Sequence, residues 1–158
     1  IMNSNLGLNP IPIFIKISPD LSYKQLEEIV ELACQYKIEG TIATNTSIDH
    51  KMLTKNTKFL KGGVSGKPLF TKSTKTLAML SVISDGQIPL IGVGGVFSGE
   101  DAYKKICAGA TVIQLYSALA FFGPGLIQSI LFDLNKLLES RGFAHISEAI
   151  GTAKHEFK

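Results

Sequence analysis

Apolar runs and amphipathic stretches alternate along this chain, and the alternation predicts its fold class. Four short runs rich in Ile and Val, bounded by Gly, Pro or Asn, span residues 11–17, 41–45, 89–93 and 111–116. Runs of this kind are typical of parallel strands that are covered on both faces. The stretches between them carry apolar residues three or four positions apart, as amphipathic helices do. Strands and helices in alternation predict an α/β fold with a parallel sheet.

Capping residues mark the expected starts of two helices. Ser22 with Gln25, and Ser98 with Asp101, have the spacing of N-terminal capping pairs. A further helix is expected over about residues 124–142, after which we expect a polar tail with one more helical turn. The apolar stripe of that helix comprises Ile127, Ile130, Leu131, Leu134 and Leu138.

Two architectures fit four βα units in 158 residues, namely an open doubly wound sheet and part of a (β/α)₈ barrel. A complete barrel needs roughly 250 residues, so the chain corresponds to about half of one. No linker or repeat divides the sequence, and residues 1–158 are expected to form one partial barrel domain. The connection over residues 46–70 is longer than a simple βα connection, which makes it a candidate functional loop.

Composition and charge argue against several classes of function. Sixteen Lys and Arg against thirteen Asp and Glu give a net charge of +3, and the basic residues are scattered, unlike those of nucleic-acid binders. Cys34 and Cys107 lack the spacing of a zinc or redox pair. His50, His145 and His155 form no metal-ligand motif, and no two carboxylates pair as an acid and a base. No apolar run approaches the ~20 residues of a membrane span.

Polar residues follow the first two predicted strands at their carboxyl ends, where parallel sheets bind ligands. Lys16 interrupts the first apolar run and either presents its ammonium to an anion or a cofactor, or extends into solvent. Its apolar neighbours Ile15 and Ile17 favour partial burial of the charge. The Thr-Asn-Thr segment 44–46 suits a polar planar ligand, although such residues also close strands as Asx or Ser/Thr turns.

Glycine-rich segments point to a bound anion. Residues 62–68 lack the spacing of a Walker A loop and form either a ligand-contacting loop or a flexible turn. Residues 92–95 join the third strand to a capped helix, an arrangement that binds phosphate through backbone N–H groups. Tyr116 and Ser117 follow the fourth strand, and barrels commonly bind phosphate with the loops after their last two strands. We therefore expect a phosphate site there.

These segments, taken in order, resemble dihydroorotate dehydrogenases, most closely the quinone-linked, membrane-associated class. The motifs that carry the resemblance are residues 12–20 (PIFIKISPD), 44–46 (TNT), 62–69 (GGVSGKPL), 91–95 (IGVGG) and 114–119 (QLYSAL). The resemblance runs from Pro12 to about Gly151. It implies that the chain is the C-terminal half of such an enzyme, with strands five to eight of its barrel. The catalytic base, a serine in this family, is then expected upstream of Ile1.

The resemblance also implies roles for the residues at the strand ends. Those that would contact FMN are Lys16, Thr44, Gly66, Gly95, Tyr116 and Ser117. Those that would bind the pyrimidine substrate are Asn45 and Thr46. Within the first set, the lysine would stabilise negative charge on the flavin, and the last three residues would hold its phosphate. No metal is expected.

The implied activity is oxidation of dihydroorotate to orotate in the pyrimidine pathway that leads to UMP, with FMN as cofactor and a membrane quinone as electron acceptor. The implied location is peripheral, at a bacterial or mitochondrial inner membrane, through a segment before Ile1. The fragment by itself is expected to be inactive. Two alternatives stay open: another phosphate-binding barrel enzyme that takes a phosphorylated metabolite, and a non-catalytic half-barrel that works by association.

Overall fold

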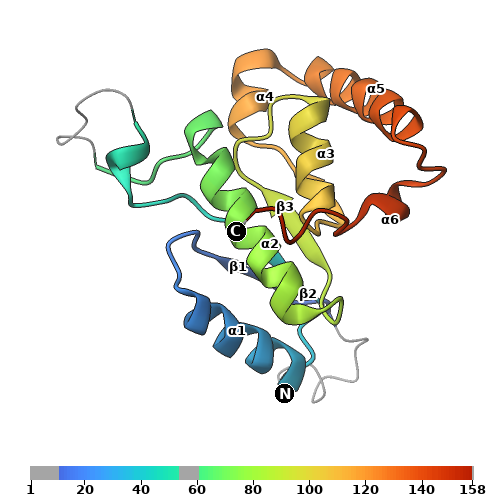
Figure 1. Ribbon diagram of the computed structural model, residues 1–158. Helices are drawn as coiled ribbons and strands as arrows, with labels where there is room; N and C mark the ends of the chain where they lie inside the picture. The colour runs from blue at the N-terminus through green and yellow to red at the C-terminus, as the bar shows by residue number, and fades with distance from the viewer. Residues whose placement is uncertain (1–10, 54–60, 158) are drawn as a thin grey trace.

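The fold is a four-stranded parallel sheet in the order β1-β2-β3-β4, as seen in a computed structural model that describes residues 11–53 and 61–157 (Figure 1). The strands are β1 (Phe14–Ile17), β2 (Gly40–Ala43), β3 (Leu90–Val93) and β4 (Val112–Gln114). All three strand pairs are parallel. The predicted α/β fold with a parallel sheet is confirmed, and each strand is shorter than the apolar run that predicted it.

Helices connect the strands and follow the last of them. The longer helices are α1 (Tyr23–Gln35), α2 (Phe70–Ser84), α3 (Gly99–Cys107) and α5 (Gly125–Ser140). The shorter ones are α4 (Ser117–Phe122), α6 (Ile146–Ala149) and the 3₁₀ helices η1 (His50–Met52) and η2 (Lys67–Leu69). Ser22 and Gln25 form the predicted capping box of α1, and the Ser98 side chain caps α3 through the Asp101 N–H. The sequence did not predict α4.

Helices cover only one face of the sheet, so the expectation that the strands are covered on both faces is wrong for this chain. The strand register places Ile17, Ala43 and Gly92 on the covered face, where all three are buried. The opposite face carries Phe14, Lys16, Ile42, Ile91 and Val112, none of which is buried. Within the described residues, no helix lies over this second face. The sheet is therefore open on one side.

The main core lies between the covered face of the sheet and helices α1 and α2. Leu26 of α1 and Leu77 and Leu80 of α2 are fully buried and belong to one apolar cluster with residues of β1, β2 and β3. A side chain on Gly92 would lie 2.9 Å from the Ala110 side chain. Glycine in the centre of β3 therefore allows the neighbouring segments to approach the sheet closely.

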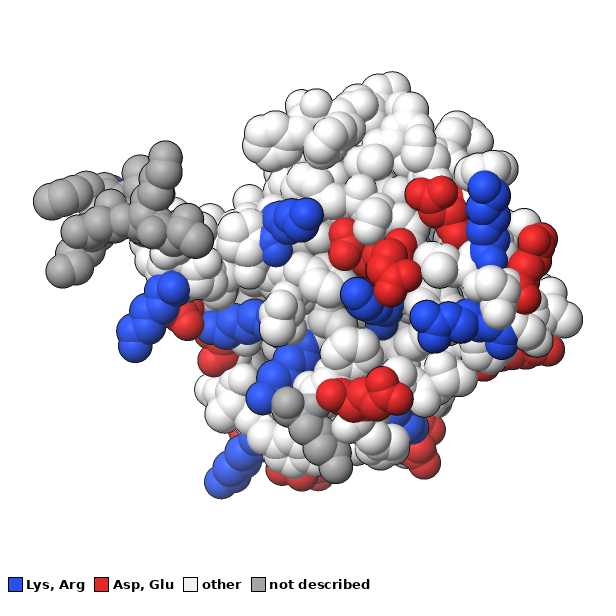
Figure 2. Space-filling view, turned by 45° about the horizontal axis from the view of Figure 1, so that its top comes forward, with Lys and Arg blue, Asp and Glu red and all other residues white. Residues whose placement is uncertain are grey.

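Helix α5 packs on α3, beyond the β4 end of the sheet. Of its predicted apolar stripe, Ile130 and Leu134 are buried, whereas Ile127 and Leu131 are 42% and 53% exposed. The stripe therefore lies on α5 as predicted, but α3, with 9 residues against the 16 of α5, leaves part of it exposed. Positive and negative side chains lie interspersed over the molecular face shown in Figure 2.

An ion-pair network centred on Asp20 ties three segments together at the carboxyl end of β1. Its carboxylate lies 2.5 Å from Lys72 Nζ of α2, accepts a hydrogen bond from Ser47 Oγ at 2.6 Å, and accepts another from the Ile48 N–H at 2.9 Å. Partial burial by itself would raise the pKa of Asp20, but these hydrogen bonds outweigh it and lower the pKa to about 2. The network therefore fixes the segment after β2 against α2 and the end of β1.

Asp20→Asn is expected to lower the free energy of unfolding by about 2 kcal/mol at pH 7, because hydrogen bonds to a charged group are lost. A carboxyl whose pKa is lowered by folding stabilises the native state above its unfolded pKa, and that contribution disappears as pH falls from about 4 to about 2. Urea unfolding of the complete gene product at several pH values tests this. The difference between the two proteins should shrink as Asp20 becomes protonated.

Asp85→Asn is the matched control, because Asp85 is exposed and lies 3.5 Å from Lys154 in a surface ion pair. Such pairs contribute ~0–1 kcal/mol, so this variant should unfold almost as the unmodified protein does. A stability difference for Asp20→Asn that stays constant down to pH 2 would contradict the role given to its charge.

Candidate functional site

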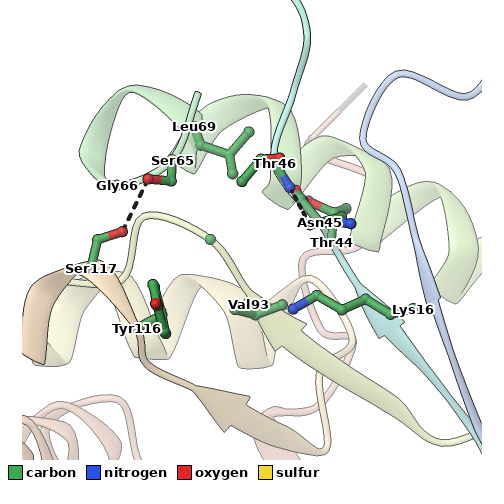
Figure 3. Close-up of a pocket in the computed structure, with 11 residues that line it drawn as sticks. Lys16, Thr44, Asn45, Thr46, Ser65, Gly66, Leu69, Val93, Tyr116 and Ser117 are labelled. Atoms are coloured by element: carbon green, nitrogen blue, oxygen red, sulfur yellow. Dashed lines mark hydrogen bonds between the residues drawn. The ribbon is translucent and has the colours of Figure 1, made fainter. Parts of the chain in front are cut away.

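A pocket of about 270 Å³ lies at the carboxyl ends of the strands (Figure 3). Of the eight residues predicted as site residues, those that line it are Lys16, Thr44, Asn45, Thr46, Gly66, Tyr116 and Ser117. Gly95 does not line it, and its neighbour Gly94 does. The sheet brings these residues together because the carboxyl ends of parallel strands meet at one edge.

The end of β2 forms the middle of the pocket. Thr44 is buried and its N–H donates to the Val93 carbonyl at 3.1 Å, which joins this segment to the end of β3. Asn45 is exposed, and its Oδ1 accepts a hydrogen bond from the Thr46 N–H at 2.9 Å. The local turn considered from the sequence is therefore present. In the part of the chain that the structure describes, the Asn45 Nδ2 donates no hydrogen bond, so it is available to a ligand.

Lys16 extends across the strand ends with its ammonium directed toward Val93 (Figure 3). The side chain is exposed, so the expected partial burial by Ile15 and Ile17 is wrong in this structure. The reason is that these neighbours point to the covered face, while Lys16 lies on the open one. No ion pair within the described residues engages its ammonium. The charge is free to face an anion or an electron-rich ring.

The long connection between β2 and α2 forms one wall of the pocket. Its base is closed by an antiparallel bridge between Ser47 and Val64, and its residues 54–60 lie outside the described part of the chain. Gly66, at φ +71°, directly precedes η2 and lies beside Ser117, whose Cβ would be 3.6 Å from a side chain placed there. Ser117 Oγ donates to Ser65 Oγ at 3.3 Å. The loop is thereby held against the start of α4.

The turn after β3 presents backbone N–H groups without partners. Gly94 and Gly95 have φ values of +107° and +77°, which glycine adopts without strain. Within residues 11–53 and 61–157, neither of their N–H groups donates a hydrogen bond. Successive unpartnered N–H groups at a glycine turn suit an anion such as phosphate. The sequence-based expectation of an anion site here agrees with this geometry.

The pocket lining holds no Asp, Glu, His or Cys side chain. His50 lies outside it, with Nε2 2.9 Å from the Gly62 carbonyl. Among the described residues, no group of three or more His, Cys, Asp or Glu side chains is placed to hold a metal ion. The described lining therefore offers hydrogen-bonding groups and one ammonium to a ligand, and no carboxylate or imidazole that could act as a general base.

Four lining residues were not predicted individually: Ser65, Leu69, Val93 and Gly94. Ser65, Val93 and Gly94 belong to segments that the sequence had already marked as glycine-rich or as strand ends, and Leu69 closes the motif 62–69 that carries the family resemblance. Which residue of such a segment faces the pocket depends on backbone angles, as the exchange of Gly95 for Gly94 illustrates. The sequence was therefore sufficient to predict which segments line the pocket, but not which residue of each segment does so.

Comparison with known proteins identifies a family. The family model of dihydroorotate dehydrogenase matches residues 3–138. A dihydroorotate dehydrogenase (quinone) from Cereibacter sphaeroides is 47% identical over 148 residues, which are 94% of this chain and 42% of that protein. A mitochondrial dihydroorotate dehydrogenase (quinone) from Arabidopsis thaliana is 49% identical over 144 residues, 90% of this chain and 31% of that protein.

The fold agrees with that result. The crystal structure of ligand-free DHODH from Eimeria tenella superposes with a TM-score of 0.83 at 34% identity, over 88% of this chain and 39% of that one. The chain thus spans less than half the length of the curated relatives described above.

Gly95→Ala is expected to lower the free energy of unfolding by about 3 kcal/mol, from a strained backbone and overpacking together. A Cβ at this position would lie 2.6 Å from Phe70 Cα. Gly86→Ala is the matched control, because Gly86 has φ +78° and nothing within 4 Å of an added Cβ. Its cost should be only about 1 kcal/mol, from backbone strain. Chemical unfolding of both variants measures the difference, and equal losses would show that the close approach to Phe70 is unimportant.

Proposed function

This chain belongs to the dihydroorotate dehydrogenase family, and on that premise we propose that the complete protein oxidises dihydroorotate to orotate with FMN as cofactor and a membrane quinone as electron acceptor. The family is flavin-dependent in general, and relatives at 47% and 49% identity bear the quinone-linked name. The reaction would serve pyrimidine synthesis toward UMP. The observation that carries the proposal is the convergence of the Lys16 ammonium, the Asn45 amide and the unpartnered Gly94 N–H on one pocket.

The pocket residues fit a flavin with a phosphate group. The N–H group of Gly94 in the pocket lining and that of Gly95 next to it would bind the phosphate, together with the Ser117 hydroxyl. Gly66 and Thr44 leave space for a flat ring, and Lys16 would place its charge beside it. When bound, FMN supplies an acceptor for the hydride that leaves the substrate. Lys16 would favour this transfer because its charge offsets the negative charge that develops.

Asn45 and Thr46 are proposed to orient the pyrimidine. The free Asn45 Nδ2 is a hydrogen-bond donor that suits a ring carbonyl or a carboxylate, and the exposed Thr46 hydroxyl adds a second polar group. The proton that leaves the substrate would be removed by a serine before Ile1. These residues would thus hold the substrate, and the base would act from another segment.

We further propose that the four βα units are strands five to eight of a (β/α)₈ barrel. The open face of the sheet supports this, because a barrel interior would cover Phe14, Ile42, Ile91 and Val112. The share of the relatives that the chain covers, 42% and 31%, also agrees with about half a barrel plus further segments. The fragment by itself is then expected to be inactive.

Membrane association is proposed through a segment before Ile1. No helix in the described part of the chain is both long and apolar enough to cross a bilayer. The proposal of peripheral attachment rests on the quinone-linked names of the relatives, one of which is mitochondrial.

The test is purification of the complete gene product, with its flavin identified by absorbance and mass and its activity assayed with dihydroorotate and a quinone. Bound FMN and quinone-dependent orotate formation support the proposal. A flavin-free protein that binds a phosphorylated metabolite would support another barrel enzyme instead. A protein without either property, active only in complex with another chain, would support a non-catalytic half-barrel.

Lys16→Met is expected to slow reduction of the bound flavin by dihydroorotate about 100-fold, the usual loss when a group that stabilises developing charge is removed. Stopped-flow absorbance of the complete enzyme at full FMN occupancy measures this rate. Lys24→Met is the control, because Lys24 is exposed on α1 and does not line the pocket. An unchanged reduction rate for Lys16→Met would show that the lysine only extends into solvent.

Asn45→Ala is expected to raise the KM for dihydroorotate about 10-fold or more while FMN content stays normal, because a substrate hydrogen bond is lost and no FMN contact is. Steady-state kinetics together with flavin occupancy test this. Loss of FMN without a change in KM would assign Asn45 to the cofactor.

A further inference from the structure

Lys105 of α3 is a lysine buried directly beneath the pocket. Its side chain is 0% exposed. Its Nζ donates to Ser73 Oγ at 2.6 Å and to the Val93 carbonyl at 3.5 Å, and it lies 5.3 Å from the centre of the Phe70 ring. No carboxylate of the described residues lies within ion-pair distance of this nitrogen. Burial of an ammonium without a counter-charge is far more costly than burial of an apolar side chain.

The surroundings of Lys105 leave its charge largely uncompensated. Burial lowers the pKa of its ammonium to about 7, while the field of Asp101, one turn earlier on α3, acts in the opposite direction. The parts of α2 and β3 that touch it present a phenyl ring, a hydroxyl and a carbonyl, none of which titrates near neutral pH. Asp133 of α5 packs against Gly99, and Arg141, which follows α5, lies over the Tyr103 ring, so both contact other positions of α3. Lys136 and Glu139 contact residues of α5 itself.

The contacts of Lys105 orient the glycine turn above it. Lys105 donates to the Val93 carbonyl and to Ser73 Oγ. The Ser73 hydroxyl in turn lies 3.0 Å from two acceptors, the Gly94 carbonyl and the Phe70 carbonyl of its own helix. Both peptide bonds that follow are trans, so each N–H points opposite to the carbonyl of its own peptide. The N–H groups of Gly94 and Gly95 are therefore directed away from Lys105 and Ser73. As described above, neither of these N–H groups donates a hydrogen bond within the described residues, so both remain available to a phosphate.

We propose that Lys105 is a positioning residue for the phosphate of FMN: it holds the turn over residues 93–95 so that two N–H groups face the phosphate, and it supplies the positive charge beneath them. The inference rests on the proposed function, because it requires a phosphate at this turn. In the complex the phosphate would lie one layer of backbone away from the ammonium and would act as a counter-charge, which no carboxylate of the described residues supplies at ion-pair distance. An apolar side chain of the same length would fill the same space without this effect.

The experiment compares binding of FMN and of riboflavin, which lacks the phosphate, to the flavin-free form of the complete enzyme. Lys105→Met should raise the Kd for FMN about 10- to 100-fold and change the Kd for riboflavin less than about threefold. Ser73→Ala should weaken FMN selectively in the same way, because the Gly94 carbonyl loses its donor. Lys104→Met is the control, since Lys104 forms an exposed pair with Glu100 at 3.4 Å, and both Kd values should stay unchanged.

A second measurement needs no variant. Since burial lowers the pKa of the ammonium to about 7 and a bound phosphate stabilises its charged form, FMN binding at pH 8 should be accompanied by proton uptake of at most one proton, and riboflavin binding by none. Calorimetry in two buffers of different ionisation enthalpy counts these protons. Lys105→Met should abolish the uptake, and thermal unfolding should show that the variant is folded.

Two results would overturn the role of Lys105 and leave the proposed function standing: equal weakening of FMN and riboflavin by Lys105→Met, or a normal enzyme that prefers FMN but takes up no proton. A normal enzyme that binds neither flavin would overturn both the role and the proposed function.

Discussion

The first turn of α2 lies directly against the carboxyl ends of β1 and β3, and the candidate site depends on this contact. Phe70 packs so closely on Gly95 that no side chain fits between them, and Ser73 hydrogen-bonds the Gly94 carbonyl at 3.0 Å. The same helix reaches the end of β1, where Thr76 donates to the Pro19 carbonyl at 3.4 Å. A helix approaches strand ends this closely only where glycine leaves the space. Gly95 thus allows the close packing, and Gly94 lines the pocket with an N–H group that has no partner among the described residues.

Lys72 and Lys105 both lie at this contact, but their ammonium groups have different partners and different degrees of burial. Lys72 donates to Asp20 and its pKa is raised by that hydrogen bond, so its charge is satisfied and serves to join three segments. Lys105 lies deeper, has hydroxyl and carbonyl partners only, and its pKa is lowered by burial. A satisfied ion pair stabilises the fold, whereas an uncompensated buried charge is a common property of functional sites.

The open face of the sheet and the greater length of the relatives point to the same conclusion, that a further segment covers this face. Strands β1 and β4 are the edges of the sheet, and the face that carries Lys16 is uncovered in the described chain. The relatives are more than twice as long as the part that this chain matches. Exposed strand edges and apolar faces favour pairing with a further segment. A ligand site at the border of such a face would be completed by whatever covers it, which fits a pocket lining that offers hydrogen-bond donors and a positive charge but no Asp, Glu, His or Cys side chain.

The sequence by itself determined the order of the elements and the segments of the site. Local signals sufficed for this: Ser22 and Gln25 cap α1 across three residues, and polar residues that follow parallel strands meet at one edge whatever the rest of the fold. The tertiary structure alone decided burial. Lys104 and Lys105 are adjacent and chemically identical, yet the first is half-buried with its side chain 45% exposed and the second is fully buried, because helix rotation and the position of α2 select between them. It likewise decided that Lys16 faces the open side of the sheet and that Gly94, not Gly95, lines the pocket. Burial depends on distant segments, and no local pattern encodes where those segments pack.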